Sequence, residues 1–199
     1  MNWTQLINLP NVLTISRIFL TVLFLGLLFA DTWYWRSMAF VVFGLASLTD
    51  LYDGRLARSR SQVTSFGTFM DPLADKILVT SALVAFVLGR LVNSWLVLPI
   101  VARDVLITGM RLYGVYHGRQ MEISRLAKWK TAAQLCAVVV ILFVTGLQEV
   151  LGQFNYGGFP MEGGWVPVLF NGLVATVLLL TLLSGFHYFF LSGYSYNES

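Results

Sequence analysis

Six apolar runs, each about as long as a membrane-spanning helix, dominate this sequence. They cover roughly residues 12–30, 37–54, 67–89, 95–117, 129–148 and 165–191. A helix needs about 20 mostly apolar residues to cross the hydrocarbon core of a bilayer. Only 12% of the 199 residues are charged, whereas soluble domains carry roughly 25%. We therefore expect an all-α membrane protein with six transmembrane helices, in which residues 1–199 form a single polytopic membrane domain.

The basic residues between the runs predict the orientation of the helices. Lysine and arginine concentrate in the cytoplasmic loops of membrane proteins. One side of the predicted topology holds seven basic residues and the other holds two: Arg55, Arg58, Arg60, Arg119, Arg125, Lys128 and Lys130 against Arg36 and Arg90. We expect a multi-pass protein of the inner (cytoplasmic) membrane, with both termini in the cytoplasm. The net charge of +3 is modest and does not suggest nucleic acid as a partner.

Four aspartates lie between the second and third runs, within TDLYDGRLARSRSQVTSFGTFMDPLAD, residues 49–75. Asp50 and Asp53 are three apart, and Asp71 and Asp75 are four apart. Both spacings place side chains on one face of a helix. Ionisable groups at membrane depth are costly and usually mark a functional site. We therefore expect the two pairs to meet at a polar site on the cytoplasmic side.

Four carboxylates at one site predict bound metal. They cannot all stay ionised unless cations compensate their charge, and oxygen ligands suit hard divalent cations. Histidine and cysteine are absent from residues 49–75, which favours Mg²⁺ or Mn²⁺ over zinc. We expect one or two such ions holding a phosphorylated ligand. Structural ion pairing is the alternative, with Arg55, Arg58 and Lys76 as partners.

Small residues beside the aspartates also fit a ligand site. Gly54 and Ala57 follow Asp53, and Gly67 lies one turn before Asp71. Small residues allow a ligand or a neighbouring backbone to approach closely. Arg58 can offer its planar fork of donors to a phosphate. Close packing between helices is the alternative reading of the three small residues.

This pattern resembles the signature of the CDP-alcohol phosphotransferase family, D-x2-D-G-x2-A-R-x8-G-x3-D-x3-D. Every fixed position is matched, by Asp50, Asp53, Gly54, Ala57, Arg58, Gly67, Asp71 and Asp75. The resemblance implies six transmembrane helices around a polar active-site cavity that faces the cytoplasm. It also implies a homodimer. In this family two divalent metals bridge the aspartates and the diphosphate of a CDP-linked substrate.

The resemblance further implies a role for each matched residue. Asp50, Asp53 and Asp71 are expected as metal ligands, and Asp75 as both a metal ligand and the general base toward the acceptor hydroxyl. Contacts with the CDP-linked lipid are expected from Asp53, Gly54, Ala57, Arg58 and Gly67, joined on the nucleotide side by Thr49, Asn11, Thr14 and Arg17.

A second basic region predicts the nature of the acceptor. Arg103 and Arg111 share a helical face with position 107, and Lys128 and Lys130 open the next helix. Such a cationic pocket suits an acceptor that carries a phosphate. We expect these four residues to bind that phosphate, although membrane topology is the favoured explanation for Lys128. For Arg103 the alternative is a pair with Asp104, which we disfavour because adjacent helical residues diverge.

Four further stretches narrow the resemblance. LPNVLTISR, DPLADKILVT, ARDVLITGMR and AKWKTAAQ are similar to stretches of the bacterial branch of the family that uses glycerol 3-phosphate. This implies CDP-diacylglycerol and glycerol 3-phosphate as substrates, and phosphatidylglycerophosphate and CMP as products. Inositol phosphate and phosphatidylglycerol stay open as acceptors. A divalent-cation transporter is the alternative from another class, but it requires a continuous polar pathway.

Overall fold

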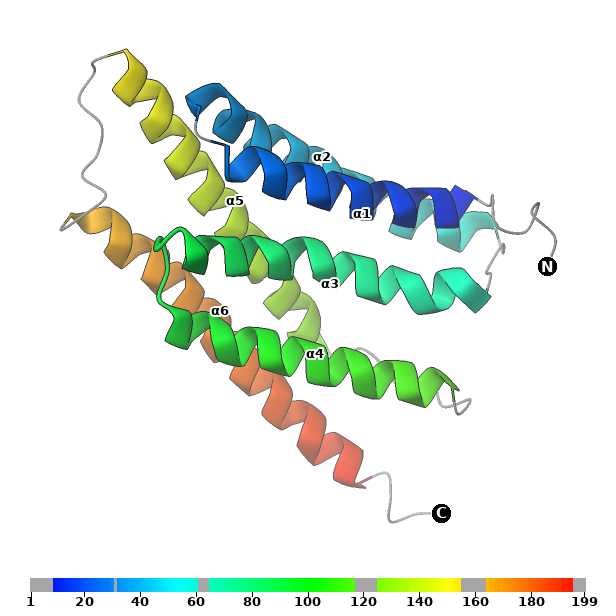
Figure 1. The fold of residues 1–199 in the computed structure, drawn as a ribbon. Coiled ribbons are helices and arrows are strands. Elements are labelled where there is room, and N and C mark those ends of the chain that lie inside the picture. Colours follow the sequence, from blue (N-terminus) through cyan, green and yellow to red (C-terminus); the bar gives the residue numbers. More distant parts are fainter. Residues whose placement is uncertain (1–8, 31, 61–64, 117–124, 155–163, 195–199) are drawn as a thin grey trace. The chain divides into compact units, whose positions relative to one another are not determined.

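The computed structural model describes the backbone of residues 9–30, 32–60, 65–116, 125–154 and 164–194 (Figure 1). All regular structure in these ranges is helical: α1 (Leu9–Leu28), α2 (Trp33–Arg60), α3 (Ser65–Leu88), α4 (Ser94–Tyr116), α5 (Arg125–Gln153) and α6 (Trp165–Tyr194). Side chains are described for 15–30, 32–49, 76–110, 112–114, 116, 126–154 and 164–186. Each helix overlaps one of the six apolar runs, so the expected all-helical fold is confirmed over this part of the chain.

Among the residues that the structure describes, two helices are long and apolar enough to cross a membrane. Their apolar segments are Leu126–Gln153 in α5 and Trp165–Phe186 in α6. Two shorter apolar helical segments, Ile15–Leu28 and Lys76–Leu88, lie in α1 and α3. The count of six membrane spans and the cytoplasm-facing cavity therefore stay predictions.

The chain divides into two compact units, and the expectation of a single domain stays a prediction. Residues 1–85 and 139–158 form the first unit. Within it, α1 and α2 lie side by side, joined by a short connection (Figure 1). The buried residues of α2 recur at intervals of three and four, which is the pattern of one helical face: Ala39, Val42, Phe43 and Ala46. Phe24 of α1 meets this face, with its ring centroid 5.3 Å from that of Phe43.

Residues 86–138 and 159–199 form the second unit, in which α4 packs against α6. The buried stripe of α6 continues from apolar to hydroxyl side chains: Val166, Phe170, Val174, Val177, Thr181 and Ser184. Asn93 caps the start of α4, because its Oδ1 accepts from the backbone N–H of Trp95 at 3.2 Å. Asn171 of α6 accepts from the backbone N–H of Asn93 at 2.9 Å. These contacts fix the first turn of α4 against α6.

Candidate active site

The four aspartates lie on the two helices that flank residues 61–64. Asp50 and Asp53 belong to the last part of α2, and Asp71 and Asp75 to the first half of α3. Helical backbone at both places agrees with the predicted grouping of each pair on one helical face. The side chains of residues 50–75 lie outside the description. The metal site therefore stays a prediction, as do the ligand contacts of Gly54, Ala57, Arg58 and Gly67.

Two residues expected near the nucleotide have described side chains. The Thr49 hydroxyl donates to the backbone carbonyl of Ala46 at 2.8 Å, which leaves its oxygen able to accept. Arg17 is buried in α1, with 4% of its surface exposed. Asn11 and Thr14 also lie on α1, but their side chains lie outside the description. The nucleotide contacts of all four residues stay predictions.

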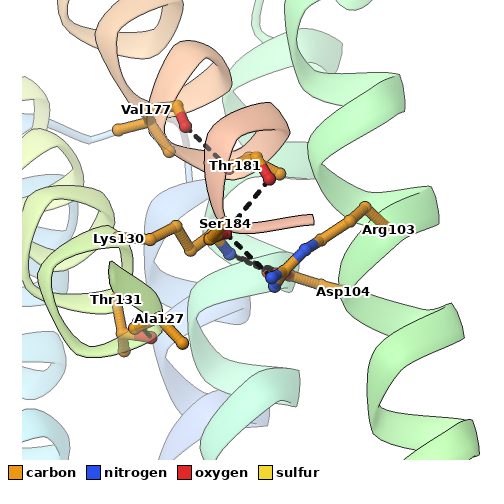
Figure 2. A network of polar contacts seen from close by, with 8 residues as sticks. All are labelled: Arg103, Asp104, Ala127, Lys130, Thr131, Val177, Thr181 and Ser184. Atoms are coloured by element: carbon orange, nitrogen blue, oxygen red, sulfur yellow. Dashed lines mark hydrogen bonds and ion pairs between the residues drawn. The ribbon is translucent and has the colours of Figure 1, made fainter. Parts of the chain in front are cut away.

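A buried ion pair joins α4 and α5 within the second unit (Figure 2). The Nζ of Lys130 donates to Asp104 Oδ1 at 2.6 Å and also to Oδ2. Lys130 is fully buried, and Asp104 exposes 2% of its surface. Buried charges require such close partners, because removal from water otherwise disfavours the ionised forms.

Arg103 connects this ion pair to α6. Its Nη1 donates to Asp104 Oδ1 at 3.3 Å, and its Nη2 donates to Ser184 Oγ at 2.8 Å. The Ser184 hydroxyl in turn donates to the carbonyl of Thr181 at 3.1 Å. Ser184 thus gives its proton to the backbone and accepts from the guanidinium with its oxygen. Figure 2 shows this continuous chain of contacts from α6 through Arg103 to the carboxylate.

The expectation that Arg103 and Asp104 would diverge is wrong. Successive residues on a helix are rotated by about 100°, but the long arginine side chain turns back far enough for Nη1 to reach Oδ1. Lys130 remains the closer partner and contacts both carboxylate oxygens. Asp104 therefore lies between two cations.

The charges of this cluster do not cancel. Lys130 and Arg103 contribute two positive charges and Asp104 one negative charge, so the three groups sum to +1. The Arg103 side chain exposes 17% of its surface, against 1% for Lys130 and 2% for Asp104. Its Nε is buried without a hydrogen-bond partner, although a guanidinium offers five N–H donors. The cluster can therefore attract an anion, and Arg103 is its most accessible member.

The other two cations expected at the acceptor are not part of this network as described. Lys128 lies on α5 with an exposed side chain. Arg111 lies on α4, two turns after Arg103, and its side chain lies outside the description. Phosphate binding by the four expected cations stays a prediction.

Sequence reasoning missed three members of the network. Asp104 enters the expectations only as a possible neighbour of Arg103, and Thr181 and Ser184 do not enter them. A carboxylate within an apolar helix was itself a signal, because such groups usually have a functional or ionic partner. For the hydroxyl residues the available signal was their spacing, which continues the apolar stripe of α6.

Comparisons with known proteins agree with the family resemblance seen in the aspartate motif. The model of the family described as CDP-alcohol phosphatidyltransferase matches residues 7–177. A Bacillus subtilis protein named CDP-diacylglycerol–glycerol-3-phosphate 3-phosphatidyltransferase is 34% identical over 194 residues, covering 92% of this chain and 93% of that protein. A protein of the same name from Cereibacter sphaeroides is 37% identical over 163 residues, covering 79% of this chain and 71% of that protein. A third protein of this name, from Pseudomonas fluorescens, is 41% identical over 142 residues, covering 68% of this chain and 72% of that protein.

Proposed function

The chain belongs to the CDP-alcohol phosphatidyltransferase family, and from this premise we propose that it is an enzyme of phospholipid biosynthesis. It transfers the phosphatidyl group of CDP-diacylglycerol to the 1-hydroxyl of glycerol 3-phosphate, giving phosphatidylglycerophosphate and CMP. The observation that carries this conclusion is the alignment with the Bacillus subtilis protein, whose name states both substrates and which matches 92% of this chain. The family match over residues 7–177 includes the whole aspartate signature.

The aspartates offer a donor set that fits divalent cations, on which this family generally depends. All four potential ligands are carboxylates, on helical positions three and four apart. Carboxylate oxygen is the donor that Mg²⁺ and Mn²⁺ prefer. The proposed site holds two ions and consists of Asp50, Asp53, Asp71 and Asp75. When bound, the ions would neutralise the diphosphate and stabilise charge on the departing CMP.

Asp75 is the proposed general base. It accepts the proton of the 1-hydroxyl as that oxygen forms a bond to the β-phosphorus of CDP-diacylglycerol. The bond between this phosphorus and the CMP oxygen breaks, and CMP leaves with the electron pair. A positioned base typically contributes about 10²–10⁴-fold to such a rate, and holding the reactants in line supplies much of the remainder.

The donor lipid is bound by residues on three helices. Gly54, Ala57 and Gly67 leave room for the nucleotide and diphosphate, and Arg58 contacts the diphosphate through its fork of donors. Further contacts on the nucleotide side are proposed for Asp53, Thr49, Asn11, Thr14 and Arg17. The acyl chains stay in the bilayer while the head group reaches these polar positions.

The phosphate of the acceptor binds the second basic region. Arg103 and Arg111 of α4 are its proposed direct contacts, together with Lys128 of α5, and Lys130 belongs to the same cationic cluster. The net charge of +1 on the group of Arg103, Asp104 and Lys130 supports an anionic acceptor, because a neutral acceptor gains nothing from a cation held at a buried site.

The surroundings of the enzyme follow from the same proposal. It is a multi-pass protein of the inner membrane with six spans, and its active site and both termini face the cytoplasm. The cytoplasmic orientation is supported by the excess of basic residues on that side. The functional unit is a homodimer, which the mass of the purified protein–detergent complex would test.

CMP release by the purified protein tests the proposed activity. The assay contains CDP-diacylglycerol, Mg²⁺ or Mn²⁺, and one acceptor at a time: glycerol 3-phosphate, inositol phosphate or phosphatidylglycerol. We expect release that requires glycerol 3-phosphate and that stops when EDTA is added. Release with a different acceptor alone would overturn the acceptor assignment. Absence of release from folded protein, together with metal flux into liposomes, would replace the enzyme with a transporter.

A further inference from the structure

We propose that Asp104 and Ser184 are positioning residues, which hold the guanidinium of Arg103 ready for the anionic group of the acceptor. This inference rests on the proposed function, because it concerns how the same acceptor is bound. Both residues contact the terminal nitrogens of Arg103, at 3.3 Å and 2.8 Å. Ser184 lies beyond the family match, which ends at residue 177.

Lys130 acts through Asp104 and does not touch the acceptor. Its side chain exposes 1% of its surface, and its ammonium group donates to both oxygens of the carboxylate. An incoming phosphate would have to displace Asp104 to reach it. Lys130 instead neutralises Asp104, so that the charge of Arg103 remains available to an anion.

Arg103 is fixed from two helices. Asp104 binds Nη1 from α4 and Ser184 binds Nη2 from α6. Because a guanidinium is planar, fixing both terminal nitrogens sets the direction of the whole fork. Ser184 is itself oriented by its bond to the Thr181 carbonyl at 3.1 Å. An arginine ordered before binding loses less conformational freedom when the ligand arrives.

Gly185 lets the backbone of α6 approach the Nε edge of the guanidinium. A Cβ added at this glycine would lie 3.8 Å from Arg103 Nε. The backbone of α6 therefore passes beside Nε without placing a side chain against it. The same Nε is buried without a hydrogen-bond partner. Each terminal nitrogen keeps a second N–H beyond its bond to Asp104 or Ser184, and these two N–H groups are the donors left for the ligand.

Steady-state kinetics of three variants test this inference, with CMP release as the signal. Ser184→Ala removes one anchor and leaves the buried ion pair intact. Lys130→Met removes the counter-ion of Asp104, and Lys130→Met combined with Asp104→Asn restores the net charge of +1. Thr176→Ala is the matched control, because Thr176 is an exposed residue of α6 whose hydroxyl donates to the carbonyl of Gly172.

We expect Ser184→Ala to raise the KM for glycerol 3-phosphate by about tenfold, the effect of losing one hydrogen bond to a charged group. The KM for CDP-diacylglycerol should stay within about twofold, since this bond is not made to the donor. Lys130→Met should raise the KM for glycerol 3-phosphate at least as much. The double variant should recover most of that loss, because Arg103 no longer faces an uncompensated carboxylate.

The outcomes separate this inference from the proposed function. Wild-type release that does not require glycerol 3-phosphate would overturn both. Glycerol 3-phosphate-dependent release, with an unchanged KM in Ser184→Ala, would overturn the positioning role alone. A double variant as impaired as Lys130→Met would contradict the role of Lys130 as the residue that neutralises Asp104. If Lys130→Met fails to fold, Ser184→Ala still decides the matter, because it leaves the ion pair in place.

Discussion

Lys130 donates from Nζ to both carboxylate oxygens of Asp104, a residue 26 positions earlier on a different helix. Neither side chain exposes more than 2% of its surface. Removing one member of such a pair leaves the other charge buried without this counter-ion, at a cost of about 3–5 kcal/mol. We predict that Lys130→Met lowers the free energy of unfolding by about 3 kcal/mol, measured by titrating SDS into mixed micelles.

Lys128→Met is the matched control for stability, since Lys128 lies two residues earlier on α5 and is exposed. Its free energy of unfolding should change by no more than about 0.5 kcal/mol. Replacing both members of the pair with apolar residues, as Asp104→Leu with Lys130→Met, should destabilise less than Lys130→Met alone. Equal stability of Lys130→Met and Lys128→Met would contradict the buried ion pair.

The ion pair of Arg36 and Glu149 has a different environment and should have a different energy. Its atoms Nη1 and Oε1 are 2.5 Å apart, but the side chains expose 41% and 27% of their surface. Exposed ion pairs contribute about 0–1 kcal/mol to the free energy of unfolding. Arg36 Nε also donates to the carbonyl of Ala30 at 2.8 Å, in the connection that precedes α2.

We therefore predict that Glu149→Gln lowers the free energy of unfolding by less than about 1 kcal/mol. Arg36→Ala should lower it more, because this substitution also removes the bond to the Ala30 carbonyl. The same SDS titration checks both variants. If Glu149→Gln lowered the free energy of unfolding as much as Lys130→Met does, exposure would not weaken the pair of Arg36 and Glu149.

Arg90 lies two residues after the end of α3, in a backbone conformation that favours glycine. Its φ is 55°, and the flanking hydrogen bonds, Leu91 N–H to Phe86 at 2.9 Å and Arg90 N–H to Val87 at 3.0 Å, form a Schellman motif. The left-handed conformation costs a non-glycine residue about 1 kcal/mol. We predict that Arg90→Gly raises the unfolding temperature by a few degrees, whereas Arg90→Lys leaves it unchanged. A lower unfolding temperature in Arg90→Gly would contradict this geometry.

Asp75→Asn should remove the proposed base and leave a residue of nearly the same shape. We predict that kcat falls by at least about 100-fold, because general-base catalysis contributes about 10²–10⁴-fold. Binding of a cytidine nucleotide to the purified variant should remain measurable by calorimetry, since the other three aspartates are unchanged. Full turnover by Asp75→Asn would overturn its role as the base.

Arg111→Ala should weaken binding of the acceptor, glycerol 3-phosphate, more than binding of the donor, CDP-diacylglycerol. We predict a rise of about tenfold or more in the KM for glycerol 3-phosphate, because a charged hydrogen bond to its phosphate is lost. The KM for CDP-diacylglycerol serves as the internal control and should change little. An unchanged KM for glycerol 3-phosphate would remove Arg111 from the acceptor site.

The helices were predictable from sequence because length and hydropathy are local properties. The ends of the helices were less predictable from the sequence, as α2 shows. Apolar character predicts an end near residue 54, yet α2 continues to Arg60. The polar residues that follow Asp53 retain helical backbone after the apolar run has ended. Hydropathy therefore locates the apolar part of a helix better than its boundary.

The aspartate site and the cationic cluster differ in what the sequence reveals. The four aspartates between residues 50 and 75 follow a motif of fixed spacing within one segment. Their grouping on helical faces could therefore be predicted from the sequence. The pairing of Asp104 with Lys130 depends on how α4 packs against α5, which no local pattern specifies. The reach of Arg103 to Ser184 depends likewise on α6. Tertiary packing alone determines which cation is buried and which stays accessible.

The transfer of radiolabel from glycerol 3-phosphate into lipid is the most direct test of the proposed phosphatidyl transfer. Purified protein would be incubated with CDP-diacylglycerol, a divalent cation and radiolabelled glycerol 3-phosphate, and both CMP and lipid-soluble label would be quantified. We predict equimolar CMP and labelled phosphatidylglycerophosphate, with both formed at least about 100-fold more slowly by Asp75→Asn. CMP without labelled lipid would mean that the donor is hydrolysed or passed to another acceptor, and the proposed function would be wrong.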